Sequence, residues 1–322
     1  MSDDLGGLTP AQQDVVDVLR ARDRPRPVVE PGLRHDLRAR LESGLGDLAA
    51  RLDKPLFVSK GALSRVHACE AHHLAEEAAD FVWTVAAARG TVAHKAIELS
   101  VHRRDSPPPL VLVDAALDRL ADDPGHPLAG FLLGLEEAAR AELRSQVNDL
   151  VAGFVELWPP LRPRWVPRTE SRLRAELCGG MVILSGRADL TLGAPEGMTA
   201  GRLIVDLKTG RTHPGHVDDL RLYALLETLR CGVPPFRLAV YALDAGVATV
   251  EEVDEGVLEA AVRRTIAGGR RLLELHLGLR SAQVTPNPAC RWCRVRTTCE
   301  GAGRWAAHRA DVDLDVDVDI EV

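Results

Sequence analysis

The stretch from Gly186 to Gly210 constrains the fold of this chain more than any other. Residues 202–207 form an almost continuous apolar run that a glycine soon ends, which predicts a buried strand. Successive side chains on a strand point to opposite faces, so Asp206 and Lys208 should share one face. Asp189 occupies a similar place on the preceding strand-like run. An antiparallel hairpin would therefore bring Asp189 next to Asp206.

Two carboxylates and a main-chain carbonyl suit a hard divalent cation such as magnesium, which prefers oxygen ligands. A lysine beside such an ion can orient a water, or help to deprotonate it, for attack on a phosphodiester. The alternative is an ordinary Asp–Lys ion pair on a surface strand. Lysine is rare in this chain, which has four among 40 basic residues: Lys54, Lys60, Lys95 and Lys208. This rarity favours a role for Lys208 that arginine could not fill.

The composition indicates a globular protein with a substantial core, because 46% of the 322 residues are hydrophobic. We expect no membrane association, because no apolar run reaches 18 residues, and a cytoplasmic location, because the N-terminus lacks a secretory pattern. The net charge is −7, but six of the 47 acidic residues lie within residues 311–321. The remaining 41 acidic residues nearly balance the 40 basic ones, so a local basic groove for nucleic acid stays possible.

The hydrophobic patterns predict helices, then strands, then a helix, two further strands and a long amphipathic helix. This order indicates a mixed α/β fold, with one sheet flanked by helices. We expect a helical N-terminal extension at 1–58, a main domain at 59–309 and an acidic tail at 310–322. The tail alternates acidic and apolar residues, which is compatible with disorder, with an edge strand or with mimicry of DNA. Residues 106–160 are expected to be scaffold.

Two earlier segments carry candidate functional residues. Gly90, His94 and Glu98 are four residues apart and should lie on one face of a helix, where His94 is either a ligand or an ordinary half-buried histidine. Glu170 could be an additional metal or supporting acid. A set of arginines surrounds Glu170 and forms either a track for a phosphate backbone or a solvated strand face: Arg162, Arg164, Arg168, Arg172 and Arg174.

The cysteines indicate a metal centre rather than disulfides. Cys290, Cys293 and Cys299 form a C-x2-C-x5-C pattern, and three thiolates need a fourth ligand to hold zinc or an iron–sulfur cluster. The fourth ligand is a histidine or one of the other three cysteines, Cys69, Cys178 and Cys231. Four arginines and two tryptophans surround the pattern and would suit a single strand of nucleic acid, unless the tryptophans pack around the metal: Arg291, Arg294, Arg296, Arg304, Trp292 and Trp305.

Taken together, these motifs resemble the RecB-like branch of the PD-(D/E)xK nuclease superfamily, which includes the RecB and AddB nuclease domains and the CRISPR-adaptation nucleases. The resemblance covers residues 59–301. Gly90 and His94 supply the family's G-x3-H, and Gly186, Arg187 and Asp189 supply its G-R-x-D. Asp206, Lys208, Thr209 and Gly210 supply D-x-K-T-G. Cys69 and the closing trio of cysteines supply the cysteine pattern.

The resemblance implies that His94, Asp189 and Asp206 bind Mg²⁺ or Mn²⁺ and that Lys208 acts on the attacking water. It also implies that Cys69 joins the closing trio to hold a [4Fe–4S] cluster. Tyr223 matches the tyrosine of the family's Q-x3-Y helix, whereas Asp219 stands at the usual glutamine. The chain has no P-loop, so it is not itself a helicase.

The expected function is therefore a metal-dependent deoxyribonuclease that acts on single strands or ends in DNA repair, recombination or defence. A rival prediction is a catalytically weak iron–sulfur DNA-binding module, a subunit of a helicase–nuclease complex, which the Asp219 departure and the net charge favour. A third is a helical scaffold held together by zinc.

Overall fold

The computed structural model describes residues 7–20, 25–101, 107–210 and 215–307, and residues 310–322 of the predicted acidic tail lie outside this set. The chain divides into two compact units. The first unit comprises residues 1–38, 83–175 and 185–262, and the second comprises residues 39–82, 176–184 and 263–322. The boundaries predicted at residues 58 and 309 stay a prediction.

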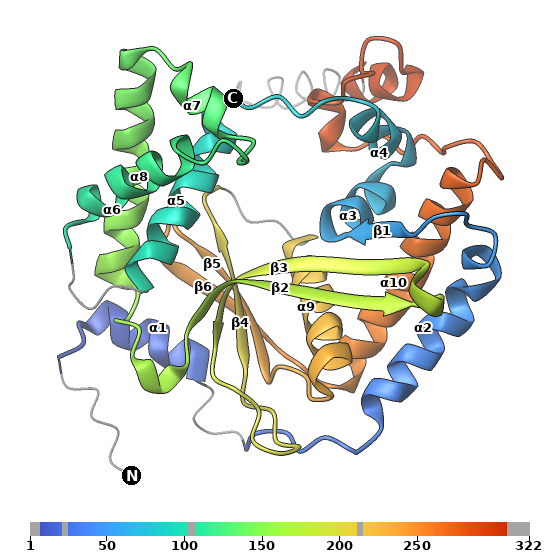
Figure 1. The fold of residues 1–322 in the computed structure, drawn as a ribbon, viewed down its shortest axis with the longest axis horizontal. Coiled ribbons are helices and arrows are strands. Elements are labelled where there is room, and N and C mark those ends of the chain that lie inside the picture. The colour runs from blue at the N-terminus through green and yellow to red at the C-terminus, as the bar shows by residue number, and fades with distance from the viewer. Residues whose placement is uncertain (1–6, 21–24, 102–106, 211–214, 308–322) are drawn as a thin grey trace, which may run out of the picture. The chain divides into compact units, whose positions relative to one another are not determined.

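One mixed sheet forms the centre of the fold (Figure 1). Its strands are β1 (Leu56–Ser59), β2 (Arg168–Leu177), β3 (Val182–Leu192), β4 (Leu203–Lys208), β5 (Arg237–Ala242) and β6 (Val247–Glu252). Their order is β1-β3-β4-β5-β6, and β2 pairs with β3. The pairs β3–β4 and β5–β6 are antiparallel, whereas β4–β5 is parallel. The predicted mixed sheet flanked by helices is confirmed.

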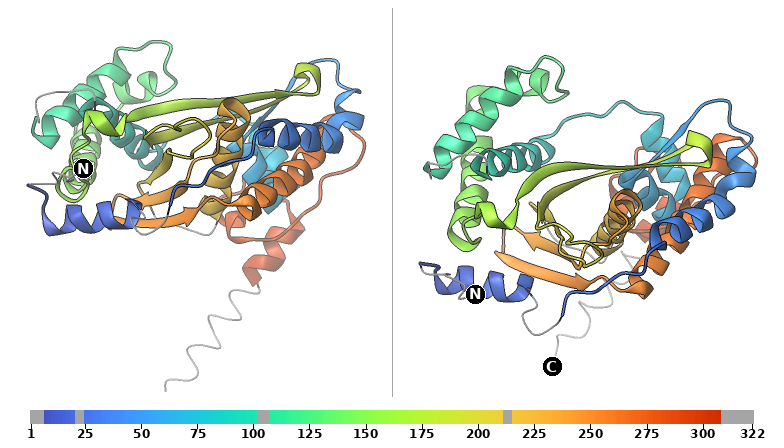
Figure 2. Two further views of the ribbon diagram at one scale, coloured as in Figure 1. Left: turned by 90° about the horizontal axis from the view of Figure 1, so that it is seen from below. Right: turned by 60° about the horizontal axis from the view of Figure 1, so that its bottom comes forward.

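The first unit is rich in helices (Figure 2). They are α1 (Pro10–Arg20), α5 (Val85–Val101), α6 (Pro109–Ala121), α7 (Ala129–Leu133), α8 (Glu137–Leu157) and α9 (Gly215–Cys231). Helix α9 connects the parallel strands β4 and β5, because a parallel pair needs a long crossover. In the described part of the chain, no helix combines the length and the apolar character that crossing a membrane requires.

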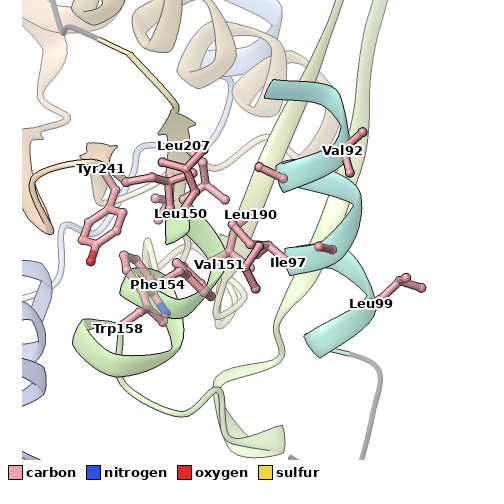
Figure 3. Packing of buried hydrophobic residues seen from close by; sticks show 14 of the residues in the cluster. Val92, Ile97, Leu99, Leu150, Val151, Phe154, Trp158, Leu190, Leu207 and Tyr241 are labelled. Carbon is pink, nitrogen blue, oxygen red and sulfur yellow. The ribbon is translucent and has the colours of Figure 1, made fainter. Parts of the chain in front are cut away.

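The core of the first unit lies between β3–β5 and a layer of α5, α6 and α8 (Figure 3). Strand β4 is buried along residues 203–207, which explains its continuous apolar run. The ring of Trp158 meets the ring of Tyr241 edge-on at 4.7 Å and stacks on Phe154 at 5.4 Å. These contacts hold the end of α8 against β5 and so fix the helical layer against the sheet.

The second unit contains α3 (Lys60–Ala68), α4 (Glu70–Glu77), most of α2 (Leu33–Ala49) and most of α10 (Glu255–His276). Helix α3 begins where Ser59 accepts a hydrogen bond from the Ala62 amide at 3.1 Å. Buried Glu70 binds Arg280 through two hydrogen bonds of 2.6 and 2.8 Å. This pair ties α4 to the segment that leads to the closing cysteines.

Candidate active site

Asp189 and His94 meet at the edge of strand β4 in the first unit. The β3–β4 register pairs Leu190 with Val205, so its continuation sets Asp189 opposite Asp206, as predicted. The Asp189 carboxylate accepts a hydrogen bond of 2.7 Å from the Leu207 amide, and its other oxygen lies 3.4 Å from His94 Nδ1. His94 Nε2 lies 3.0 Å from the Leu207 carbonyl oxygen. Imidazole, carboxylate and main-chain carbonyl therefore converge.

Glu170 is the third member of this group. The sequence marked it as an additional metal ligand or supporting acid. Ligand atoms of His94, Glu170 and Asp189 all lie within 4.8 Å of one another. Glu170 also forms an ion pair of 2.8 Å with Arg187. Its φ of 49° is left-handed, which costs a non-glycine residue about 1–3 kcal/mol and is typical of functional sites. The backbone of β2 thus adopts an unfavourable conformation at the residue whose carboxylate joins this cluster.

Asp206 and Lys208 form an ion pair beside the cluster, so they do share a face of β4. The Asp206 side chain is only 1% exposed, whereas Lys208 is 20% exposed and lines a cavity. Asp206 does not belong to the group within 4.8 Å, but its charge acts on His94. The amine of Lys208 is therefore held by a buried carboxylate while remaining accessible from the cavity.

The charges around the cluster favour the protonated form of His94 and the ionised form of Asp189. Burial lowers the pKa of His94, but the charges of Asp189, Glu170 and Asp206 outweigh burial and raise the net pKa above 6.5. Burial raises the pKa of Asp189, but His94, the Leu207 amide and Lys208 outweigh it, and the net pKa is lowered. Burial raises the pKa of Glu170. Without a metal, His94 and Asp189 thus each favour the charged form of the other.

A cavity of about 780 Å³ opens onto this cluster. Helix α5 lines it with Gly90, His94 and Glu98, so the predicted common helix face is confirmed. A side chain at position 90 would place its Cβ 3.2 Å from Thr209 Oγ1, so glycine allows α5 to approach the end of β4 closely. The cavity is also lined by residues from α6 and the loop after it: Arg119, Leu120, Asp123 and His126.

The four cavity residues of α6 and its following loop correct the prediction that residues 106–160 are only scaffold. No spacing or motif in the sequence marks Arg119 or His126. They reach the cavity because α6 packs beside α5 in the same core.

The arginine track predicted around Glu170 is divided. Arg172 lines this cavity, together with Arg187. Arg164 instead lines a second pocket elsewhere in the first unit. The five arginines therefore do not all line one cavity, and Arg172 is the member of the set that lines the candidate site.

Tyr223 lies behind the site rather than in it. Its ring is 2% exposed and packs on β3, where a Cβ at Gly186 would come within 2.5 Å of it. This close packing explains the glycine of the G-R-x-D motif. Neither Tyr223 nor Asp219 is among the residues that line the cavity, and the catalytic role of Tyr223 stays a prediction.

The second unit brings Cys69 toward the closing trio. Cys69 Sγ accepts a hydrogen bond from the Thr285 amide and Cys290 Sγ accepts one from the Asn287 amide, both at 3.4 Å. Burial and the nearby thiols of Cys290, Cys69 and Cys299 raise the pKa of Cys293. Among the described residues, no three cysteine sulfurs all lie within 4.8 Å of one another. The described cysteines therefore do not form a compact group of three, and the expected cluster stays a prediction.

One family model and two solved structures are similar to this chain. The family model described as the PD-(D/E)XK nuclease superfamily matches residues 58–300. The crystal structure of the "Putative exonuclease" from Eubacterium rectale is similar at a TM-score of 0.48 and 14% identity, covering 83% of this chain and 94% of that chain. SSO0001 gives a TM-score of 0.34 at 13% identity, covering 83% and 97%. The family match spans most of the chain and includes every residue of the candidate site, so the chain belongs to the PD-(D/E)XK nuclease superfamily.

Proposed function

We propose that the protein is a metal-dependent deoxyribonuclease of the RecB-like branch, acting on single-stranded DNA or DNA ends. The observation that carries this proposal is the convergence of His94, Glu170 and Asp189 beside the Asp206–Lys208 pair, at the base of a large cavity. The test is Mn²⁺-dependent cleavage of labelled single-stranded DNA, compared with labelled RNA and duplex DNA.

The donor set fits a hard divalent ion. His94, Asp189 and Glu170 would hold it, the Leu207 carbonyl lies against His94 Nε2, and Asp206 supplies a further carboxylate. Oxygen-rich sets with one imidazole suit Mg²⁺ and Mn²⁺. An ion held there would activate a water molecule and neutralise charge on the scissile phosphate.

The remaining residues of the cavity have separable tasks. Lys208 would hold the attacking water by its amine and assist its deprotonation, since its pairing with Asp206 fixes the position of that amine. Arg172, Arg187 and Arg119 would bind phosphates on either side of the scissile one, because they line the same cavity. In-line attack needs this kind of positioning more than it needs covalent chemistry.

We expect protons and Mn²⁺ to compete for His94. Metal binding needs the neutral imidazole, and the pKa of His94 is raised, so below that pKa the affinity for Mn²⁺ should fall by about tenfold per pH unit. Calorimetric titration of wild type and His94→Asn between pH 5.5 and 8.5 measures this. The variant should bind more weakly at pH 8.5 and show a shallower slope.

The stability of the metal-free protein should change with pH in the opposite direction. A raised folded-state pKa stabilises the protein below the unfolded-state value of 6.5, and this contribution is lost as the pH rises through the folded-state pKa. The stability advantage of wild type over His94→Asn should therefore be larger at pH 5.5 than at pH 8.5.

For the calorimetric titration, equal pH slopes of Mn²⁺ affinity in wild type and His94→Asn would contradict the assignment of His94 as a metal ligand.

The proposal extends to the [4Fe–4S] cluster in the second unit. A closed zinc site holds its sulfurs about 3.8 Å apart, because Zn–S bonds are about 2.3 Å long, and no trio of cysteines in the described residues is that compact. A four-iron cluster separates its thiolates further, since iron and sulfide ions occupy the space between them. The amides of Thr285 and Asn287 already donate to sulfur, as ligands of such clusters require.

Anaerobically purified protein should therefore be brown and contain about four iron atoms per chain. Cys293→Ser should lose most of the iron and the broad visible absorption. Cys178→Ser is the matched control, because that thiol is also part-buried in the second unit but is not among the thiols that act on Cys293, and it should keep both signals. A colourless protein with one zinc, or equal iron in the two variants, would contradict the cluster.

The surface near the closing cysteines supports contact with a single strand. Trp292 is 71% exposed, so it does not pack around a metal, and Arg291 lies over the ring of Trp305 at 5.5 Å. Exposed rings and guanidinium groups suit stacked bases and phosphates. A helicase partner that unwinds the substrate would fit the same proposal. Asp219 at the usual glutamine favours the rival, a DNA-binding subunit without useful activity, and the cleavage test separates the two.

A further inference from the structure

A second pocket lies in the first unit at the opposite end of strand β4 from Lys208. Its volume is about 230 Å³, and it is lined where β4 begins at Leu203 and where β3 ends at Leu192. Trp158 and Phe236 form its buried base, and the part-buried Trp165 contributes aromatic surface to its wall. The pocket shares no lining residue with the catalytic cavity, so it is a separate site.

The rim of this pocket is cationic. Arg20, Arg26 and Arg164 line it, and none of its lining residues is acidic. In the part of the chain that the structure describes, neither Arg26 nor Arg164 has an ion pair with a carboxylate, whereas nearby Arg237 is paired with Glu252 at 2.7 Å. Burial and the charges of Arg237 and Arg20 lower the pKa of Arg26. An anion bound at the rim would relieve this repulsion.

Arg26 is already oriented for an anion. Its guanidinium carbon lies 3.2 Å from the centre of the Phe236 ring. A guanidinium stacked on a ring keeps its N–H groups free at its edge, where they can bind two oxygens of a phosphate.

The wall beside Trp165 is fixed by close backbone contacts. The Gly193 amide donates a hydrogen bond of 2.6 Å to the Trp165 carbonyl. Gly193 has a φ of +78°, and a Cβ there would lie 2.2 Å from the Gly201 carbonyl oxygen. Only glycine fits this close backbone contact, and the contact holds the wall in one shape. A preformed pocket reduces the entropy cost of binding.

We propose that this pocket binds a nucleoside monophosphate, with the base against the ring of Trp165 and the phosphate on Arg26 and Arg164. The volume of about 230 Å³ is below the range of about 300–1,000 Å³ for drug-sized ligands, so it suits a single ring system with its charged group at the opening. The part-buried ring of Trp165 offers a flat apolar surface for a base, and the rim has guanidinium groups that match a phosphate. The nucleotide comes either from solution or from the 5′-phosphorylated end of a DNA strand.

Binding is measured with the full-length Lys208→Ala protein in EDTA, so that cleavage and metal binding at the catalytic cavity do not contribute. Deoxyadenosine monophosphate should quench tryptophan fluorescence and bind in calorimetry, at least about tenfold more tightly than either deoxyadenosine or inorganic phosphate. Arg26→Ala and Arg164→Ala should each weaken binding by about tenfold or more, the usual loss for a hydrogen bond to a charged group. Arg168→Ala, an exposed arginine that lines neither cavity, is the matched control and should not change it.

Competition identifies the source of the nucleotide. If a 5′-phosphorylated oligonucleotide displaces the mononucleotide and its 5′-hydroxyl counterpart does not, the pocket holds a strand end; if neither displaces it, the pocket takes the free nucleotide. Inorganic phosphate binding as tightly as the nucleotide, equal losses in Arg26→Ala and Arg168→Ala, or no binding at millimolar nucleotide would each overturn the proposal. Circular dichroism melting confirms that the variants remain folded.

Discussion

Replacing Lys208 with alanine is expected to lower Mn²⁺-dependent cleavage of single-stranded DNA by about 10²–10⁴-fold, the usual contribution of a positioned acid–base group. The change removes the amine that Asp206 holds at the edge of the catalytic cavity. The imidazole and carboxylates of His94, Glu170 and Asp189 remain, so the substrate phosphate and the ion can still bind. The loss should therefore appear in kcat more than in KM.

Two controls make this result specific. Lys54→Ala removes an exposed lysine of the second unit and should leave cleavage unchanged. Lys208→Met keeps the length of the side chain and should be as inactive as Lys208→Ala, while calorimetry shows that Mn²⁺ still binds to both. If wild type and Lys208→Ala cleave at the same rate, Lys208 does not act on the water. If neither cleaves with any divalent metal, the DNA-binding module becomes the better description.

Replacing Glu227 with alanine is expected to give the largest loss of stability, about 3–5 kcal/mol in the free energy of unfolding. Glu227 lies on α9 and pairs with Arg202, and their side chains are only 2% and 7% exposed. Among the described residues, the variant would leave the buried guanidinium of Arg202 with one hydrogen bond, of 3.3 Å, to the Gly193 carbonyl. A buried charge without its counter-ion accounts for the size of the effect.

Urea denaturation of the metal-free protein measures this loss. Arg230→Ala is the matched control, because Arg230 binds the same carboxylate at 2.7 Å but is 41% exposed. An exposed partner contributes little, so we expect a loss of at most about 1 kcal/mol. Similar losses in the two variants would show that the burial of Arg202 does not set the cost.

The sequence determined the parts of the site that depend on local pattern. The apolar run before Asp206 identified β4, because a strand buried on both faces must be apolar throughout. Alternation along that strand placed Lys208 beside Asp206, and helical spacing placed Gly90 and His94 on one face. In each case the neighbouring residues are close in the chain, so regular backbone geometry fixes their relation.

The structure alone revealed contacts between segments that are far apart in the chain. Glu170 joins His94 and Asp189 only because β2 pairs with β3 and its backbone adopts a left-handed conformation at that residue. Arg119 and His126 reach the catalytic cavity through the packing of α6 on α5, which the spacing within either helix does not encode. The second pocket likewise joins α1, the end of α8 and the start of β4. A local pattern records which face of an element is buried, but not which partner covers it, because many partners satisfy the same apolar face.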